Sequence, residues 1–221
     1  MIIWFASANI HKQAELASIL NGKNRAGGFS GAAGFEIKTP AGAGLAFDPD
    51  ESGGSFHENA LLKARELYRL LAERRPAPYR SGDPVIADDS GLCVDALGGR
   101  PGIFSARYGN IAGKKLEAAE RNALLLGELA GKLRRSARFV CAMVLLFSPE
   151  RFYLVQETLE GEIVKSPAYA AGTGGFGYDP VFFIPPLGRT AAELSEEEKN
   201  RVSHRGKAGK IIANILRAPD L

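Results

Sequence analysis

The chain has little that would suggest a secreted, disulfide-stapled or zinc-binding protein. Its 221 residues include only two cysteines, Cys93 and Cys141, and both lie inside apolar runs. Because there is no CxxC pair and no disulfide framework, we expect a reducing, cytoplasmic location. The three histidines, His11, His57 and His204, do not form an HxxxH spacing, which disfavours a zinc site.

Long hydrophobic runs and a strong charge bias are also missing. The longest apolar run, Phe139 to Phe147, is far shorter than the roughly 20 residues that a membrane-spanning helix needs. Residues Met1 to Phe5 lack a basic leader and are typical of a first strand rather than a signal peptide. The formal net charge of +3 is small for a nucleic-acid-binding protein. We therefore expect neither a membrane nor a nucleic-acid partner.

The composition that is present is that of an ordinary globular protein. Hydrophobic residues make up 45% of the chain and charged residues 24%, close to the average for soluble domains. A chain of this length can bury a substantial core, either as one compact domain or as two closely joined lobes.

The stretch from Val85 to Tyr108 carries the densest group of chemically useful side chains. Its apolar start, Val85 to Ala87, indicates a buried strand, and two carboxylates, Asp88 and Asp89, follow directly. We expect the strand to end at these acids, where α/β proteins usually keep their chemistry. Glycines, hydroxyls and a guanidinium come next. Together these groups suit a site for magnesium and phosphate.

The turn after the first strand is a second candidate phosphate site. Ile2 to Ala6 indicates a strand, and a helix then extends through Leu20. Ser7, Asn9 and Lys12 would lie near the start of this helix, where free N–H groups and the helix dipole favour phosphate. Serine and asparagine are also ordinary helix caps, so this turn alone does not establish a site.

The glycine-rich segment Gly172 to Gly177 matches G-x-G-x-x-G literally. We reject a dinucleotide site because a strand at Val181 to Ile184, and not a helix, is expected to follow. The loop instead suggests a flexible cradle with an aromatic face for a base.

Helix-capping signals and apolar periodicity predict the remaining elements. Capping boxes are expected at Ser55–Glu58, Thr190–Glu193 and Ser195–Glu198. The first of them starts a long amphipathic helix. Asn59 and Lys63 lie one turn apart on this helix, and capping does not explain their presence there. Further expected elements are a strand at 35–38, a helix at 116–129, a hairpin of strands 137–147 and 151–159, and a helix from about 206 to 216.

Five blocks of the sequence, in chain order, form a recognisable set: Ser7–Lys12 with Glu15, Ser55–Ala64, Ala87–Leu92 with Ala96–Arg107, Gly172–Pro180, and Lys199–Arg205. Taken together and in this order, they resemble the inosine triphosphate pyrophosphatase family. Ser7 and Ser55 stand where threonine is common in that family, and Phe104 where tyrosine is usual. The segment from Gly22 to Phe47 looks longer than is typical.

The resemblance implies a hydrolase that splits ITP, dITP and XTP into the nucleoside monophosphate and pyrophosphate, clearing deaminated purines from the nucleotide pool with Mg²⁺ as cofactor. It implies an α/β fold with a mixed, elongated central sheet flanked by helices. Residues 1–221 would form a single domain of two lobes, with the active-site cleft between them. The family's usual state is a homodimer.

The resemblance also implies roles for individual residues. Asp89 would be the catalytic general base and a metal ligand, with Glu51 as the second metal ligand; Asp50 and Glu58 remain alternatives to Glu51. The implied substrate-binding residues are Ser7, Ala8, Asn9, Ile10, His11, Lys12, Ser90, Phe176, Gly177, Tyr178, Asp179, Lys199, His204 and Arg205.

Elementary chemistry is compatible with these roles. A triphosphate carries about four negative charges, so Mg²⁺ and cations such as Lys12, Lys199 and Arg205 would stabilise the leaving pyrophosphate. A neighbouring acid would raise the proton affinity of the Asp88–Asp89 pair. A donor such as His204, or a backbone N–H beside the Phe176 ring, could bind the 6-oxo group of hypoxanthine or xanthine, which adenine lacks. Guanine carries the same group, so rejection of GTP requires a contact at the 2-position of the base.

Two alternatives stay open at this stage. The chain could hydrolyse a different nucleotide, such as dTTP, UTP or a modified nucleotide, or it could be a nucleotide-binding module without turnover. The presence of both the acid and the cations favours an enzyme over such a module.

Overall fold

The computed structural model describes residues 1–22, 34–110 and 114–218. Part of the glycine- and alanine-rich segment 22–47 therefore lies outside the described residues. The strands are β1 (Ile2–Phe5), β2 (Glu36–Lys38), β3 (Val85–Val94), β4 (Ser136–Ser148), β5 (Arg151–Ile163), β6 (Phe182–Ile184) and β7 (Arg189–Thr190). The helices are α1 (Ile10–Leu20), α2 (Phe56–Arg74), α3 (Ala118–Glu128), α4 (Glu196–Val202) and α5 (His204–Leu216).

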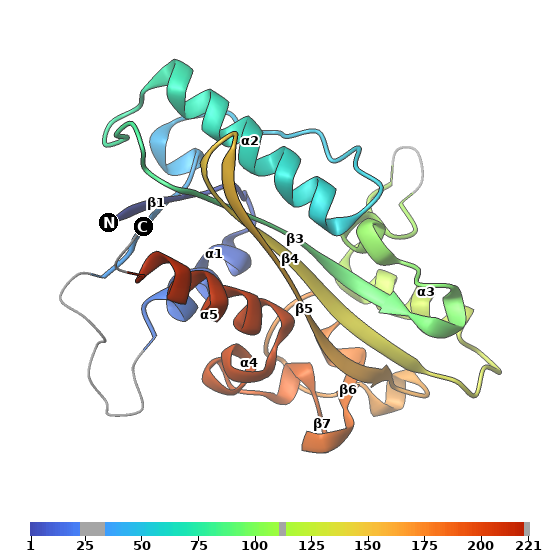
Figure 1. The fold of residues 1–221 in the computed structure, drawn as a ribbon. Coiled ribbons are helices and arrows are strands. Elements are labelled where there is room, and N and C mark those ends of the chain that lie inside the picture. The colour runs from blue at the N-terminus through green and yellow to red at the C-terminus, as the bar shows by residue number, and fades with distance from the viewer. Residues whose placement is uncertain (23–33, 111–113, 219–221) are drawn as a thin grey trace. The chain divides into compact units, whose positions relative to one another are not determined.

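Among the described residues, all seven strands belong to one sheet in the order β2-β1-β3-β4-β5-β6-β7 (Figure 1). β1 pairs in parallel with β2 and β3, whereas β6 pairs antiparallel with β5 and β7. The expected α/β fold with a mixed central sheet and flanking helices is therefore confirmed. The single-domain assignment and the cleft between two lobes stay predictions.

The chain divides into two compact units, and β3, β4 and β5 each contribute residues to both. The first unit comprises Met1–Asp89, Cys141–Glu157 and Arg205–Leu221. In this unit α2 lies on the opposite side of the strands from α1 and α5 (Figure 1). The core on the α1 and α5 side is formed by Ile3, Phe5, Leu16, Leu20, Ile86, Cys141, Met143, Leu145, Ala208, Ile212, Ala213 and Leu216.

The second unit comprises Ser90–Val140 and Thr158–His204. Its core joins α3 to the ends of β3, β4 and β5 and to β6, and the rings of Phe139 and Phe182 lie 4.4 Å apart by their centroids. The glycine-rich loop precedes a short 3₁₀ turn at Asp179–Val181 and then β6, not a helix. This arrangement confirms that the loop is not the start of a dinucleotide-binding helix.

The predicted capping signals are mostly confirmed. Both later capping boxes form with reciprocal hydrogen bonds. At the start of α2, however, only half of the box forms: Ser55 accepts from the backbone N–H of Glu58, but the Glu58 carboxylate accepts from Gly54 N at 2.7 Å. The carboxylate therefore binds the N–H group one residue before the expected one, and it still satisfies a backbone donor at the start of the helix.

The end predicted for the central strand is wrong. β3 does not stop at the acids but continues as a strand from Val85 through Val94. Asp88 and Asp89 therefore lie in the middle of the strand. The reason is that each carboxylate finds cationic partners on its own side of the sheet, so the strand can bury both without turning to solvent.

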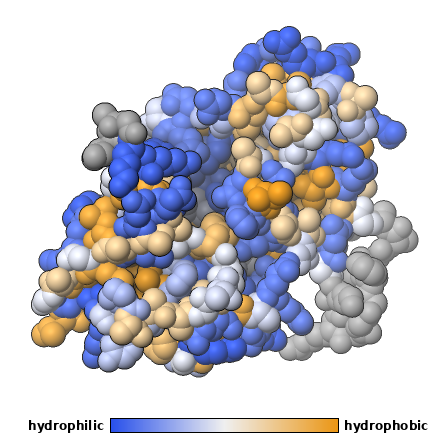
Figure 2. All heavy atoms as spheres, turned by 180° about the vertical axis from the view of Figure 1, so that it is seen from behind, coloured by the Kyte–Doolittle hydropathy of each residue, from blue (hydrophilic) through white to orange (hydrophobic). Residues whose placement is uncertain are grey.

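The outer surface carries no sign of a membrane segment in the described residues. None of the helices there combines the length and the apolar character that a bilayer crossing requires. Figure 2 shows one face of the molecule, where hydrophobic residues are interspersed with hydrophilic ones. Scattered exposed apolar side chains of this kind are normal for protein surfaces.

Candidate active site

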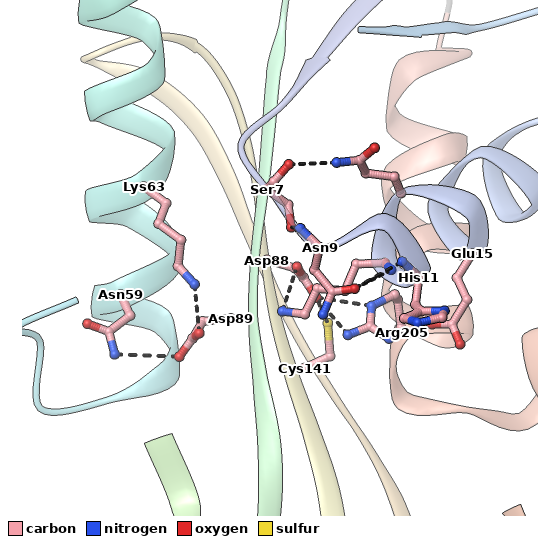
Figure 3. A network of polar contacts seen from close by, with 12 residues as sticks. Ser7, Asn9, His11, Glu15, Asn59, Lys63, Asp88, Asp89, Cys141 and Arg205 are labelled. Atoms are coloured by element: carbon pink, nitrogen blue, oxygen red, sulfur yellow. Dashed lines mark hydrogen bonds and ion pairs between the residues drawn. The ribbon is translucent and has the colours of Figure 1, made fainter. Parts of the chain in front are cut away.

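The two adjacent carboxylates of β3 point to opposite faces of the sheet. Successive side chains of a strand alternate between its faces, so Asp88 and Asp89 have different neighbours although they are adjacent in sequence. Figure 3 shows Asp89 facing Asn59 and Lys63 of α2, and Asp88 facing the α1 and α5 side together with Arg205. The two carboxylates are therefore separate sites, and the proton affinity expected to rise for the pair is raised at Asp89 but lowered at Asp88.

Asp89 is held by an ion pair from α2. The Nζ of Lys63 lies 2.8 Å from Asp89 Oδ1 and 2.8 Å from Glu51 Oε1. One buried ammonium group thus gathers two carboxylates that are far apart in sequence. Asp89 is 7% exposed and Lys63 6%, so this contact is shielded from solvent far better than a surface ion pair.

Asn59 connects Asp89 to the loop that carries Glu51. Its Nδ2 lies 3.5 Å from Asp89 Oδ2, and its Oδ1 accepts from Gly53 N at 2.8 Å. Asn59 and Lys63 are one helical turn apart on α2, which places both side chains on the face of the helix that meets β3. The unexplained spacing seen in the sequence is therefore the spacing of two residues that contact the same carboxylate.

The surroundings of Asp89 raise its pKa. Burial raises the pKa of Asp89 above its ordinary value, Lys63 lowers it, and Glu51 adds a further rise, with a net rise. Burial alone would lower the pKa of Lys63, but the two carboxylates outweigh it, so that pKa is raised and Lys63 stays charged. The basis for the raised proton affinity of Asp89 is therefore burial first and Glu51 second.

The candidates for the second metal ligand differ in their surroundings. Glu51 shares Lys63 with Asp89, whereas Glu58 is exposed and bound to Gly54 N, and Asp50 is exposed. Among the described residues no group of three His, Cys, Asp or Glu side chains could hold a metal ion. A carboxylate pair does fit Mg²⁺, which in nucleotide enzymes takes one or two protein carboxylates together with substrate phosphates and water.

Asp88 is the centre of a buried ion network on the other face of β3. Its Oδ1 lies 3.0 Å from Lys12 Nζ, and its Oδ2 lies 3.0 Å from both Nε and Nη2 of Arg205. Arg205 also pairs with Glu15 of α1. Burial would raise the pKa of Asp88, but Lys12 and Arg205 outweigh burial and hold that pKa well below its usual range. Asp88 is thus ionised at neutral pH and joins β3 to α1 and α5.

The contacts of Arg205 in this network bear on its predicted role in substrate binding. Its side chain is only 2% exposed and both Asp88 and Glu15 already bind it. Its predicted role in substrate binding remains a prediction. In the structure its contacts join α5 to β3 and α1, which is the role of a structural cation.

The burial of the Asp88 network can be tested in solution through Cys141. Its Sγ lies 3.9 Å from Asp88 Oδ2, and burial, followed by the charge of Asp88, raises the pKa of the thiol to about 12. Because the thiolate is the reactive form, we expect iodoacetamide at mildly alkaline pH to leave Cys141 unmodified in the native protein. Mass spectrometry should find it modified once guanidinium chloride unfolds the chain. Equal modification rates in the two states would contradict the buried network.

The predicted phosphate turn is present at the start of α1. Asn9 caps the helix, with its Oδ1 accepting from the backbone N–H groups of His11 and Lys12 at 3.0 and 3.2 Å. Ser7 Oγ accepts from Asn9 N at 3.2 Å. The side chain of Ile10 is 71% exposed, and Ala8 and His11 are exposed as well. The turn thus combines exposed residues with the ammonium group of Lys12, which pairs with Asp88.

The second unit holds a separate cluster around the glycine-rich loop. Asp179 Oδ2 accepts from Lys199 Nζ at 2.7 Å and from the backbone N–H of Phe176 at 2.7 Å. Lys199 Nζ also lies 4.9 Å from the centre of the Phe176 ring. Gly175 has φ +68, and a Cβ there would lie 2.0 Å from Asp179 Oδ2. Only glycine lets the loop wrap this closely around the ion pair.

The other predicted residues of the second unit lie near this cluster or in the core. Tyr178 is 5% exposed, and its hydroxyl donates to the carbonyl of Ser105 at 3.0 Å. His204 is 7% exposed and its ring stacks on Phe139, with 5.0 Å between the centroids. Ser90 is partly exposed on β3. For these three residues, as for the other predicted substrate ligands, a role in substrate binding stays a prediction.

Sequence reasoning missed residues that act through long-range contacts. Glu15 was recognised only as part of a motif, and Asn122 of α3 was not recognised at all, although its Nδ2 donates to the carbonyl of Gly177 at 3.1 Å. Each partner is far away in sequence, and no local pattern marks either residue. The only sequence signal of a long-range contact was the spacing of Asn59 and Lys63, which both contact Asp89.

Comparisons with known proteins identify the family and its fold. Residues 3–215 match the sequence model described as the Ham1 family. A dITP/XTP pyrophosphatase from Treponema denticola is 46% identical over 217 residues, covering 98% of this chain and 99% of its own. One from Nitrosomonas europaea is 43% identical, covering 97% and 93%. The solved Ham1 protein of Staphylococcus aureus superposes with a TM-score of 0.76 at 32% identity, with 98% of each chain covered. The family resemblance seen in the sequence is thereby confirmed.

Proposed function

Because the chain belongs to the Ham1 family, we propose that it hydrolyses the triphosphates of deaminated purines, ITP, dITP and XTP, to the monophosphate and pyrophosphate. The relatives named dITP/XTP pyrophosphatase that it matches along almost its whole length support this activity. The observation in the structure that carries the proposal is the convergence of Asp89 and Glu51 on Lys63 at the α2 side of β3.

In the proposed reaction Asp89 is the general base. Its carboxylate takes a proton from the water that attacks the α-phosphorus, the bond from that phosphorus to the bridging oxygen breaks, and pyrophosphate leaves. The placement of Asp89 suits this task, because its buried carboxylate is held in place by Lys63 and Asn59 of α2. Lys63 stays protonated and keeps the carboxylate in one orientation.

Magnesium is the cofactor that the donor set suits best. Asp89 and Glu51 would hold it, and when bound it would neutralise charge on the triphosphate. The turn from Ser7 to Lys12 would bind phosphate oxygens mainly through the Lys12 ammonium group, because the Ser7 and Asn9 side chains already accept from three of its backbone N–H groups. These assignments rest on oxygen donors and cations that the described residues already gather in the first unit.

Base recognition is the proposed role of the second unit. The ring of Phe176 provides a flat apolar surface for a purine, and Lys199 and Asp179 fix the loop that carries it. His204 remains the proposed donor to the 6-oxo group. A homodimer and a cytoplasmic location complete the proposal; no nucleic-acid or membrane partner is part of it.

Product analysis tests this proposal. We expect purified protein with Mg²⁺ to convert ITP and XTP to monophosphate and pyrophosphate, and to leave ATP, GTP and dTTP nearly untouched. In H₂¹⁸O the label should enter the monophosphate, because water attacks the α-phosphorus. Release of single phosphates, or label in the pyrophosphate, would contradict the mechanism. A preference for dTTP would move the chain to the alternative substrate class, and binding without turnover would make it a nucleotide-binding module.

A further inference from the structure

The backbone around Phe176 is held at two points, one on each side of the residue. On one side the N–H of Phe176 donates to Asp179 Oδ2, within the loop itself. On the other side the carbonyl of Gly177 accepts from Asn122 Nδ2 at 3.1 Å, which ties the loop to α3. Gly177 has φ +66, a left-handed conformation that needs glycine. The direction of the Phe176 side chain therefore depends on both contacts.

Asn122 is an unusual choice for this place if only stability matters. Its Oδ1 is buried and has no hydrogen-bond partner among the described residues. A buried acceptor without a partner costs about 1–3 kcal/mol, whereas an apolar side chain of the same shape would avoid that cost. The hydrogen bond from Nδ2 to the Gly177 carbonyl therefore explains why an amide stands at this position, whereas the packing of α3 does not.

We propose that Asn122 is a positioning residue for base recognition, acting through the Gly177 carbonyl to fix the orientation of the Phe176 ring against the purine. The inference rests on the proposed function. Asn122 itself does not touch the base. A flat base gains from an aromatic ring only when the ring lies in the right plane, so loosening this contact weakens substrate binding more than the chemical step.

Three variants separate positioning from stability. Asn122→Asp keeps the shape but replaces the donor with a carboxylate that cannot donate when ionised, and Asn122→Leu removes both polar atoms. Glu120→Gln changes an exposed side chain of the same helix and is the matched control, because an amide oxygen can still accept from Glu117 N.

Steady-state kinetics with ITP should show the loss in binding. One lost hydrogen bond corresponds to about a twofold to tenfold change, so we expect KM to rise by about that factor in both Asn122 variants. kcat should stay near the wild-type value, as should both constants of Glu120→Gln. Asn122→Leu should melt no lower than the wild-type protein. An unchanged KM together with a lower melting temperature would overturn the proposal and leave Asn122 a structural residue.

A measurement without nucleotide tests the contact itself. Gly177-Tyr178 is the single Gly-Tyr pair in the sequence, so protein labelled with ¹³C-carbonyl glycine and ¹⁵N tyrosine gives one carbonyl-to-amide NMR correlation. We expect the Gly177 carbonyl resonance to move upfield in both Asn122 variants and to stay unchanged in Glu120→Gln. An unmoved resonance would overturn the inference. Wild-type protein that does not hydrolyse ITP would instead overturn the proposed function, and the base-positioning role with it, while the resonance would still report the contact.

Discussion

Replacement of Asp89 by asparagine is expected to reduce kcat by about 10²- to 10⁴-fold, the range that a positioned general base contributes. Asparagine keeps the shape of the side chain and can still contact Lys63, but it cannot take the proton of the attacking water. Binding of ITP should be largely retained, because the proposed base contacts and Lys12 lie elsewhere and Glu51 remains as a magnesium ligand. Steady-state kinetics for kcat and calorimetry for ITP binding are the two measurements.

The matched control is Asp95→Asn. Asp95 is an acid of the second unit, and its carboxylate contacts Arg134, Arg138 and Ser136 at the surface. The same chemical change there should leave kcat near the wild-type value. Near-normal turnover in Asp89→Asn would remove Asp89 as the base, and a loss of nucleotide binding equal to the loss of turnover would make it a binding residue.

Replacement of Asp88 by asparagine is expected to destabilise the protein by about 3–5 kcal/mol, the typical cost of removing one partner from a buried ion pair. The change leaves the buried Arg205 paired with Glu15 and takes the carboxylate of Asp88 away from both Arg205 and Lys12. For a chain of this size each kcal/mol corresponds to about 2–4 °C in Tm, so we expect a fall of about 6–20 °C. Urea unfolding and calorimetry should give the same sign.

Asp95→Asn is again the control, because its ion pairs are partly exposed and such pairs contribute less than about 1 kcal/mol. The sign of the pH effect follows from the lowered pKa of Asp88. A carboxyl group with a lowered pKa in the folded state stabilises the fold above its unfolded pKa and loses that contribution as the pH falls through the folded value. Wild-type stability should therefore fall on acidification more steeply than that of Asp88→Asn. A Tm of Asp88→Asn equal to that of Asp95→Asn would show that the network contributes little.

Local sequence signals predicted the secondary structure well where each residue's partner is near in sequence. Asn9 before α1 and the two later capping boxes are examples, because the capped N–H groups lie within a few residues of the capping side chain. The same reasoning failed at Asp88 and Asp89. Acids usually end a buried strand, and nothing nearby in sequence shows that Lys12, Lys63 and Arg205 arrive from three different helices to neutralise them.

The sequence by itself determined the family, the order of the functional blocks and the candidates for the chemistry, because these are properties of residue type and spacing. Only the tertiary structure decided that Asp88 and Asp89 work on opposite faces of β3 and that Glu51, rather than Asp50 or Glu58, shares Lys63 with Asp89. The partners that decide these questions are distant: Arg205 is 117 residues from Asp88 and 190 from Glu15. Strand alternation separates neighbours and folding joins distant residues, so no window of sequence contains either answer.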